Sequence, residues 1–116
     1  MVFLRSVNRL KAKHANYNNG LAHIFTAAFY LAAPFPVRSP SKALAAAQEA
    51  VACAPSSRRN RYYEGLALLA SGNKASAAAS FASALEPTAT ATTQSELDID
   101  GVLMREAARG LAMAQK

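Results

Sequence analysis

The chain has 116 residues, 52% of them apolar, with one cysteine and a net charge of +6. This length allows one domain with its own core but not two. A lone cysteine cannot form a disulfide within the chain, so a small secreted disulfide scaffold is excluded and a reducing compartment is favoured. Alanine supplies 28 of the apolar residues, and alanine favours helix while burying little surface. We therefore expect an all-α protein with a thin core.

Basic residues are concentrated in the first half of the chain. Residues 1–63 contain nine Lys or Arg and one acid, Glu49, whereas residues 64–116 contain four bases and six acids. A basic half of this length predicts an anionic partner, such as RNA, an anionic membrane surface or an acidic protein face, or else belongs to a targeting sequence.

Residues 1–15 are predicted to form a basic amphipathic segment. Three apolar residues share one helical face and three bases share another, namely Phe3, Val7 and Leu10, and Arg5, Arg9 and Lys13. An acid-free amphipathic start of this kind is typical of a mitochondrial import signal, so we expect a mitochondrial location, with the cytoplasm as the alternative. A retained helix that rests on an acidic partner is the other interpretation of the segment.

The rest of the chain, residues 16–116, is predicted to be a single helical domain. Residues 21–33 form an apolar helix about 20 Å long, which is shorter than the roughly 30 Å core of a bilayer, so a buried helix is expected. Pro34, Pro36 and Pro40 are expected to make a stiff extended linker, with Pro40 as the first residue of the next helix.

Local signals mark the remaining helices. Helices are predicted at 40–54, at about 57–71 and at 73–85, opened by Ser39, by Ser56 or Ser57, and by Asn73. Gly72 is expected to close the second of these in a left-handed conformation. A last helix begins near Ser95, and we expect one of its faces to cap the stack with Leu97, Leu103 or Met104, Ala107, Leu111 and Ala114.

A period of 34 residues relates two parts of this domain, because Ala43, Ala50 and Val51 recur as Ala77, Ala84 and Leu85. Small residues at this period are typical of stacked helix hairpins, since they allow two helices to approach closely. Four further residues fit the same register: Gly65, Leu68, Gly72 and Phe81. The pattern resembles the tetratricopeptide repeat, which implies antiparallel hairpins with Tyr62 and Tyr63 supplying the packing of the second one.

Within that superfamily, residues 20–90 are most similar to the repeat module of the regulator of microtubule dynamics proteins. The residues that carry this resemblance are Ala43, Ala50, Pro55, Asn60, Arg61, Tyr63, Gly72, Asn73, Lys74, Ala84, Leu85 and Glu86. The resemblance implies an adaptor associated with mitochondria, membranes or the cytoskeleton. At most two repeats are present where a stable array needs three, so flanking helices or a partner must complete the core.

The sequence shows no catalytic constellation, phosphate loop or metal-ligand spacing. Glu96, Asp98 and Asp100 resemble the start of a calcium loop, but the twelfth position is Ala107, and acids are also favoured at a helix start. We therefore predict a non-enzymatic scaffold without cofactor or small-molecule substrate, an accessory subunit bound to other protein subunits. An RNA-associated component, such as an organellar ribosome subunit, and a membrane-surface adaptor are the alternatives.

Ten residues are candidates for contact with the partner. They are Arg5, Arg9 and Lys13 of the first segment, Phe25, Phe29 and Tyr30 of the apolar helix, and the basic and aromatic cluster of Arg58, Arg59, Arg61 and Tyr62. Bases beside aromatic rings can bind phosphates and stack on bases, although a solvated first turn of a helix or a protein contact is the commoner use of such a cluster.

Overall fold

Five α-helices make up the part of the chain that the computed structural model describes, which comprises residues 20–34, 37–86, 89, 91 and 94–116. They are α2 (Leu21–Ala32), α3 (Pro40–Cys53), α4 (Arg58–Ala70), α5 (Lys74–Leu85) and α6 (Gln94–Ala114). These bounds confirm the helices expected from the sequence to within a few residues. The prediction for residues 1–15 falls outside the described residues.

The caps explain why the helices begin where they do. In each of three helices the side chain of the residue before the first turn accepts a hydrogen bond of 3.3 Å from a backbone N–H, and the pairs are Ser39 with Lys42, Ser57 with Asn60, and Asn73 with Ser76. Gly72 ends α4 with a φ of 84°. These local signals were readable from the sequence, and the structure confirms them.

The connection between α2 and α3 differs from the expected extended linker. The carbonyl of Pro34 accepts hydrogen bonds from the N–H groups of Val37 and Arg38, at 2.9 and 3.2 Å, which is the pattern of a turn. The Arg38 guanidinium also donates to the carbonyl of Leu31 at 2.7 Å, so it satisfies an open carbonyl at the end of α2. The prediction of an extended linker is therefore wrong, because the chain folds back over the end of the helix.

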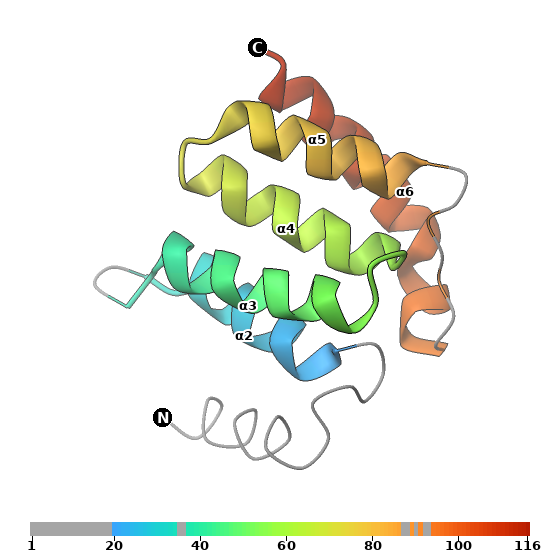
Figure 1. The fold of residues 1–116 in the computed structure, drawn as a ribbon, viewed down its shortest axis with the longest axis horizontal. Coiled ribbons are helices and arrows are strands. Elements are labelled where there is room, and N and C mark those ends of the chain that lie inside the picture. Colours follow the sequence, from blue (N-terminus) through green and yellow to red (C-terminus); the bar gives the residue numbers. More distant parts are fainter. Residues whose placement is uncertain (1–19, 35–36, 87–88, 90, 92–93) are drawn as a thin grey trace.

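Neighbouring helices pack antiparallel and form two layers (Figure 1). Helices α3, α4 and α5 lie side by side, and α2 and α6 lie behind them. Both rear helices also contact α4, so α4 touches each of the other helices. The space behind α4, between α2 and α6, is where the candidate site lies.

The core is thin, as the composition predicted. Apart from Ile24, Leu68, Phe81 and Leu103, the buried apolar residues of the described chain are all alanines. The four alanines related by the 34-residue period, Ala43, Ala50, Ala77 and Ala84, are completely buried. Tyr62 packs on the cluster around Phe81, and Tyr63 packs on the cluster around Ala27 and Ala43. Both tyrosines thus supply the packing that the sequence assigned to them.

The face of α6 that covers the stack is only partly the predicted one. Leu103, Ala107 and Ala114 are buried, which settles the choice between Leu103 and Met104. Leu97 and Met104 are exposed, so the prediction was wrong for Leu97. The first turns of α6 are held instead by polar contacts, which are described below.

Among the described residues, Phe81 is the one large apolar side chain that is completely buried, and two glycines make room for it. A Cβ atom on Gly65 of α4 would lie 2.7 Å from the Phe81 ring, and one on Gly110 of α6 would lie 2.5 Å from it. Real Cβ atoms do not approach a ring carbon so closely. The ring therefore fills the space that the two missing side chains leave between α4 and α6.

Alanine at either glycine should destabilise the protein. In an exposed helix interior, Gly→Ala normally stabilises by about 1 kcal/mol, but overpacking a core costs about 1–3 kcal/mol. We expect Gly65→Ala and Gly110→Ala to lower the free energy of unfolding, measured by urea denaturation. Gly101→Ala is the matched control, because nothing lies within 4 Å of its added Cβ, and it should stabilise. A gain in stability at Gly65 or Gly110 would contradict the close packing of the ring.

Candidate functional site

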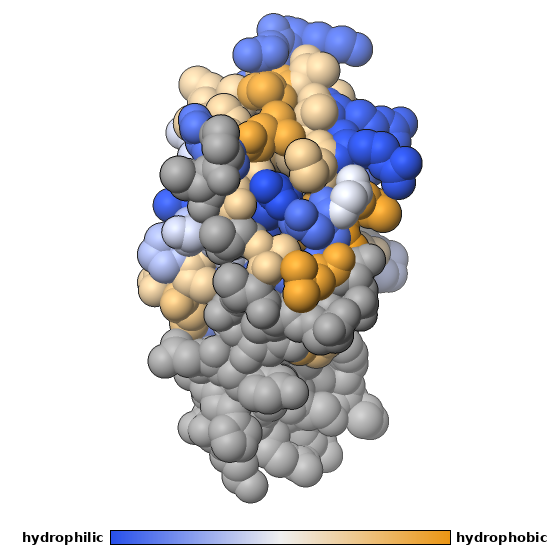
Figure 2. Space-filling view, turned by 90° about the vertical axis from the view of Figure 1, so that its right-hand side faces the viewer, coloured by the Kyte–Doolittle hydropathy of each residue, from blue (hydrophilic) through white to orange (hydrophobic). Residues whose placement is uncertain are grey.

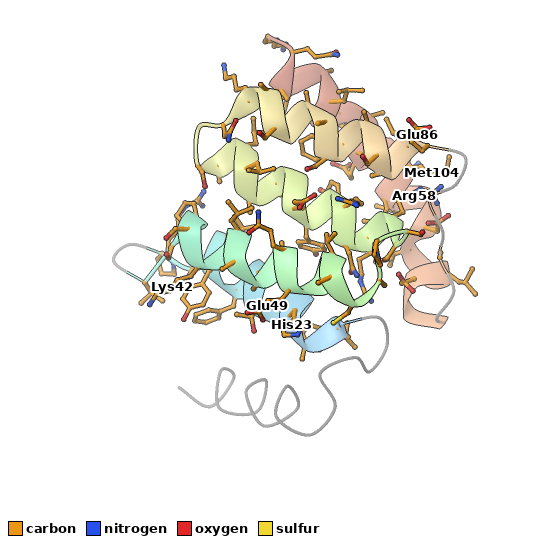
Figure 3. All side chains as sticks on the ribbon, viewed as in Figure 1. His23, Lys42, Glu49, Arg58, Glu86 and Met104 are labelled. Atoms are coloured by element: carbon orange, nitrogen blue, oxygen red, sulfur yellow. The ribbon has the colours of Figure 1, made fainter. Side chains whose placement is uncertain are left out.

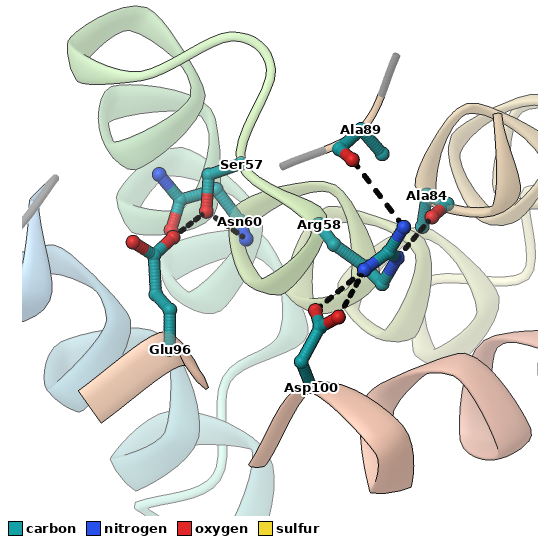
Figure 4. Close-up of polar contacts among 7 residues, drawn as sticks. All are labelled: Ser57, Arg58, Asn60, Ala84, Ala89, Glu96 and Asp100. Atoms are coloured by element: carbon teal, nitrogen blue, oxygen red, sulfur yellow. Dashed lines mark hydrogen bonds and ion pairs between the residues drawn. The ribbon is translucent and has the colours of Figure 1, made fainter. Parts of the chain in front are cut away.

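Buried polar side chains gather where α4 begins, beside the start of α6 (Figure 4). We call this group the polar cluster, and its members are Ser57, Arg58, Arg59, Asn60, Glu96 and Asp100. All are buried except Asp100, which is half-buried. The hydroxyl of Ser57 donates a hydrogen bond to the Glu96 carboxylate, and the Asn60 amide donates to the Ala50 carbonyl at 2.9 Å. These contacts join α4 to α6 and to the end of α3.

Arg58 is the centre of the polar cluster. One guanidinium nitrogen lies 2.5 Å from both carboxylate oxygens of Asp100. The other nitrogens donate to the carbonyls of Ala84 at 2.8 Å and Ala89 at 3.3 Å. A charge taken out of water needs this degree of pairing. Arg58 thus ties the start of α6 to the end of α5, and its guanidinium is occupied by its own chain.

Arg59 and Tyr63, one turn apart on α4, lie on the other side of the same helix start. Burial lowers the pKa of Arg59, and the nearby Glu96 and Tyr63 partly offset this effect. Burial likewise raises the pKa of Tyr63, which the charge of Arg59 partly offsets. At neutral pH the guanidinium remains charged and the phenol remains neutral, so the buried positive charge of Arg59 lies near the Glu96 carboxylate.

An apolar groove of about 240 Å³ opens next to this charge. We call it the α2–α4–α6 groove, and its described lining consists of Leu21, Ile24, Phe25, Ala28, Arg59, Tyr63 and Ile99. Phe25 from α2 and Ile99 from α6 are each 40% exposed. The groove therefore lies between three helices, α2, α4 and α6.

The chemistry of this groove suits binding more than catalysis. Its wall is apolar, which favours an apolar side chain, and it carries a guanidinium, which favours a carboxylate. Within the described residues, no group of three His, Cys, Asp or Glu side chains is placed to hold a metal ion. In the same part of the chain, none of the helices has the length and apolar character needed to cross a membrane.

The structure separates the predicted contact residues into different environments. Phe25 lies in the groove, whereas Phe29 and Tyr30 are half-buried and form an edge-to-face pair with ring centroids 5.2 Å apart. Lys42 of α3 lies 5.4 Å from the Tyr30 ring centroid. The three bases of the first segment fall outside the described residues.

The basic cluster at the start of α4 is not the solvated first turn that the sequence suggested. Arg58 and Arg59 are buried, so that interpretation is corrected for both. Arg61 is half-buried, bonded to the Pro55 carbonyl at 3.1 Å and to Glu64 at 3.2 Å. Tyr62 packs against the Phe81 ring. The partners of the two buried arginines come from distant parts of the chain, which a local pattern does not reveal.

The structure also shows the positions of two residues, His23 and Ile99, that were not among the ten candidates. His23 of α2 is buried, and its Nδ1 lies 2.9 Å from a carboxylate oxygen of Glu49 on α3 (Figure 3). Ile99 was not among the candidates, although it lines the groove. Ile99 and Phe25 lie far apart in the sequence. The only sequence feature that could have marked Ile99 as a candidate was its apolar side chain on the exposed side of an amphipathic helix.

No family model matches the chain, and no curated protein or solved structure matches it either. The function is therefore inferred from the chain's own residues and from the geometry of the groove.

Proposed function

We propose that this protein is a non-enzymatic interaction scaffold, an accessory subunit of a larger mitochondrial assembly, which binds another subunit in the α2–α4–α6 groove. The observation that carries the proposal is the groove itself, an apolar surface open to solvent with a buried guanidinium in its wall. Its occupant is an apolar helix or loop of another protein with a carboxylate beside its apolar side chains. Such a segment places apolar atoms against Phe25 and Ile99 and its charge near Arg59.

The thin core supports the same proposal. Alanine contributes little burial. We interpret the antiparallel pairs α2–α3 and α4–α5 as two tetratricopeptide-like hairpins, which are fewer than the three repeats that make a stable array. Covering the groove with a partner adds apolar burial where the chain has little of its own. Binding of a partner to the folded state raises its stability by mass action.

The RNA-associated alternative loses part of its support. Both Arg58 and Arg59 are buried, and Arg58 is bonded to Asp100 and to backbone carbonyls. Phosphate contacts need accessible bases, and of this cluster only Arg61 keeps substantial exposure. We therefore do not propose RNA binding or membrane binding as the function, and the experiment below distinguishes both from the scaffold.

The test is native purification of the endogenously tagged chain from a mitochondrial fraction, with sizing and mass spectrometry before and after nuclease treatment. We expect a nuclease-resistant complex with other subunits. Phe25→Glu and Ile99→Glu should each reduce the recovered subunits at least tenfold, because a carboxylate in an apolar contact loses its hydration. The matched control is Val37→Glu, at an apolar residue of similar exposure outside the groove.

The outcomes separate the alternatives. Loss of the associated material after nuclease supports an RNA-bound component, and recovery with lipid vesicles alone supports a membrane adaptor. Recovery of the chain without other subunits contradicts the scaffold. If Val37→Glu removes the subunits as completely as Phe25→Glu does, the groove is not the binding site.

A further inference from the structure

A second apolar surface lies along α6, away from the groove. Its residues are Leu97, Gly101, Met104, Ala108 and Leu111, and we call them the α6 stripe. The alternating spacings of four and three residues keep all five on one side of the helix over about 21 Å. Leu97 is 54% exposed and Met104 46% exposed. Gly101 and Ala108 are also exposed, and Leu111 is half-buried because part of its side chain packs against the cluster around Phe81.

The α6 stripe is distinct from the face with which α6 covers the stack. That face consists of Leu103, Ala107, Gly110 and Ala114, all buried. Figure 2 looks onto the side of the molecule that α6 forms and shows apolar residues at this surface among charged ones. A helix that closes a repeat stack normally turns a polar side to water. Here the outermost helix offers an apolar one.

We propose that the α6 stripe pairs with the α6 stripe of a second copy of this chain, in an antiparallel dimer whose two-fold axis passes near Met104. The order of residue sizes carries the argument, because large and small residues alternate about Met104 in nearly the same order in both directions. In an antiparallel pair, Leu97 lies opposite Leu111 of the second copy, and Gly101 lies within one residue of the position opposite Ala108 of the second copy. A two-fold interface requires this self-complementarity, whereas a partner of different sequence does not.

The small residues set how closely the two helices approach. Gly101 and Ala108 leave space on the helix surface, and nothing of the chain itself lies within 4 Å of a Cβ built on Gly101. Small residues at a helix contact let the backbones come near, while the larger residues between them interlock. The alternation along the α6 stripe thus favours a close pair with Met104 at its centre.

Charge selects the antiparallel orientation. Residues 94–101 contain three acids and no base, whereas residues 102–116 contain three bases and one acid. An antiparallel pair brings the acidic end of each helix to the basic end of the other, and a parallel pair brings like ends together. Glu96 and Asp100 are held by Ser57 and Arg58. The acid whose helix position borders the α6 stripe is Asp98.

Helical periodicity puts position 98 and Arg109 on the same flank of the α6 stripe, so an antiparallel dimer brings position 98 of one copy near Arg109 of the other. Arg109 now lies 3.1 Å from Glu106 in an exposed pair, which contributes little stability and can exchange for another carboxylate. Arg105 is on this flank too, close to the two-fold axis, where it meets Arg105 of the second copy. The dimer therefore contains one unfavourable like-charged contact.

The interface is one helix pair, which buries less than the roughly 1,200 Å² of a stable complex. We therefore expect a reversible dimer whose fraction rises with concentration. The test is sedimentation of the purified, reduced full-length chain over a range of concentrations. Met104→Glu should raise the dimer dissociation constant at least tenfold, because it places two carboxylates at the axis.

Met113→Glu is the matched control. Met113 is 55% exposed and lies nine residues, or two and a half turns, from Met104 on the opposite side of α6. It receives the same substitution and should leave the dissociation constant within twofold. Circular dichroism of both variants confirms that they keep their helices. A chain that sediments as a monomer at every concentration, or a Met113→Glu effect as large as that of Met104→Glu, overturns the proposal.

Two charge variants and one cross-link test the orientation. Arg109→Glu should weaken the dimer, and Arg105→Gln should tighten it by removing the like-charged contact. In a Cys53→Ala background, an equal mixture of Leu97→Cys and Leu111→Cys chains should form the mixed disulfide on oxidation, because facing Cα atoms must lie within about 7 Å. Disulfides formed only between identical chains overturn the antiparallel arrangement. The readout is self-association, so it is independent of the subunits sought for the groove.

Discussion

Replacing Phe81 with alanine is expected to lower the free energy of unfolding by about 3–5 kcal/mol. Phe81 is the only large apolar side chain completely buried among the described residues, and it joins α4, α5 and α6. The residues around it include Ala77, Ala84 and Ala107, whose short side chains cannot move into the space left behind. A single domain has about 5–15 kcal/mol of stability in total. This one change should therefore bring the protein close to unfolding.

Urea denaturation followed by circular dichroism measures this loss, and Phe25→Ala is the matched control. Phe25 keeps 40% of its surface exposed, so its truncation should cost about 1 kcal/mol or less. A second variant tests the role of the two glycines. With Phe81→Leu in place, Gly65→Ala should cost less than it does alone, because residues in contact do not act additively. Equal costs in both backgrounds would show that the ring does not press on Gly65.

The sequence predicted most of this fold because its signals are local. Ser57 and Asn73 cap the helices that follow them, and Gly72 takes the positive φ that ends α4. The recurrence of Ala43 as Ala77 predicted two buried positions, and both are completely buried. Caps depend on neighbours within one or two turns, and small residues that recur at a fixed period can be found in the sequence alone.

The environment of Arg58 and Arg59 depends on contacts that no local pattern encodes. The Arg58 guanidinium is bonded to Ala84 and Asp100, which lie 26 and 42 residues further along the chain. Arg59 lies in the wall of a groove whose other side includes Ile99. A run of bases beside tyrosines looks like a solvated surface until the helix that supplies the carboxylates is placed beside it.

The acids at the start of α6 illustrate the same limit. Glu96 and Asp100 were interpreted as acids that favour the first turns of a helix. In the structure they accept hydrogen bonds from Ser57 and Arg58 of α4. These polar contacts hold a part of α6 whose apolar Leu97 faces solvent. The first half of α6 is thus attached through charge, and its apolar residues are left available for the groove and for the α6 stripe.

Removing the Arg58 guanidinium should therefore detach the start of α6. Arg58→Met keeps the apolar stem but leaves Asp100 and the Ala84 carbonyl without their donor, and breaking a buried ion pair costs about 3–5 kcal/mol. The value should fall at the lower end, because 27% of the Asp100 side chain remains exposed to water. Arg58→Lys should be nearly as damaging, since an ammonium cannot reach a carboxylate and two carbonyls in the geometry of the guanidinium fork.

Amide hydrogen exchange distinguishes detachment of α6 from general weakening of the fold. In Arg58→Met, the amides of residues 96–103 should exchange faster than those around Phe81, because a local opening of α6 precedes global unfolding. Arg61→Met is the matched control: its pair with Glu64 is partly exposed and lies within one helix, so its loss should cost about 1 kcal/mol or less. If both variants cost the same and exchange rises evenly along the chain, Arg58 does not hold α6. If exchange rises first in α6, this single side chain positions Ile99 in the groove.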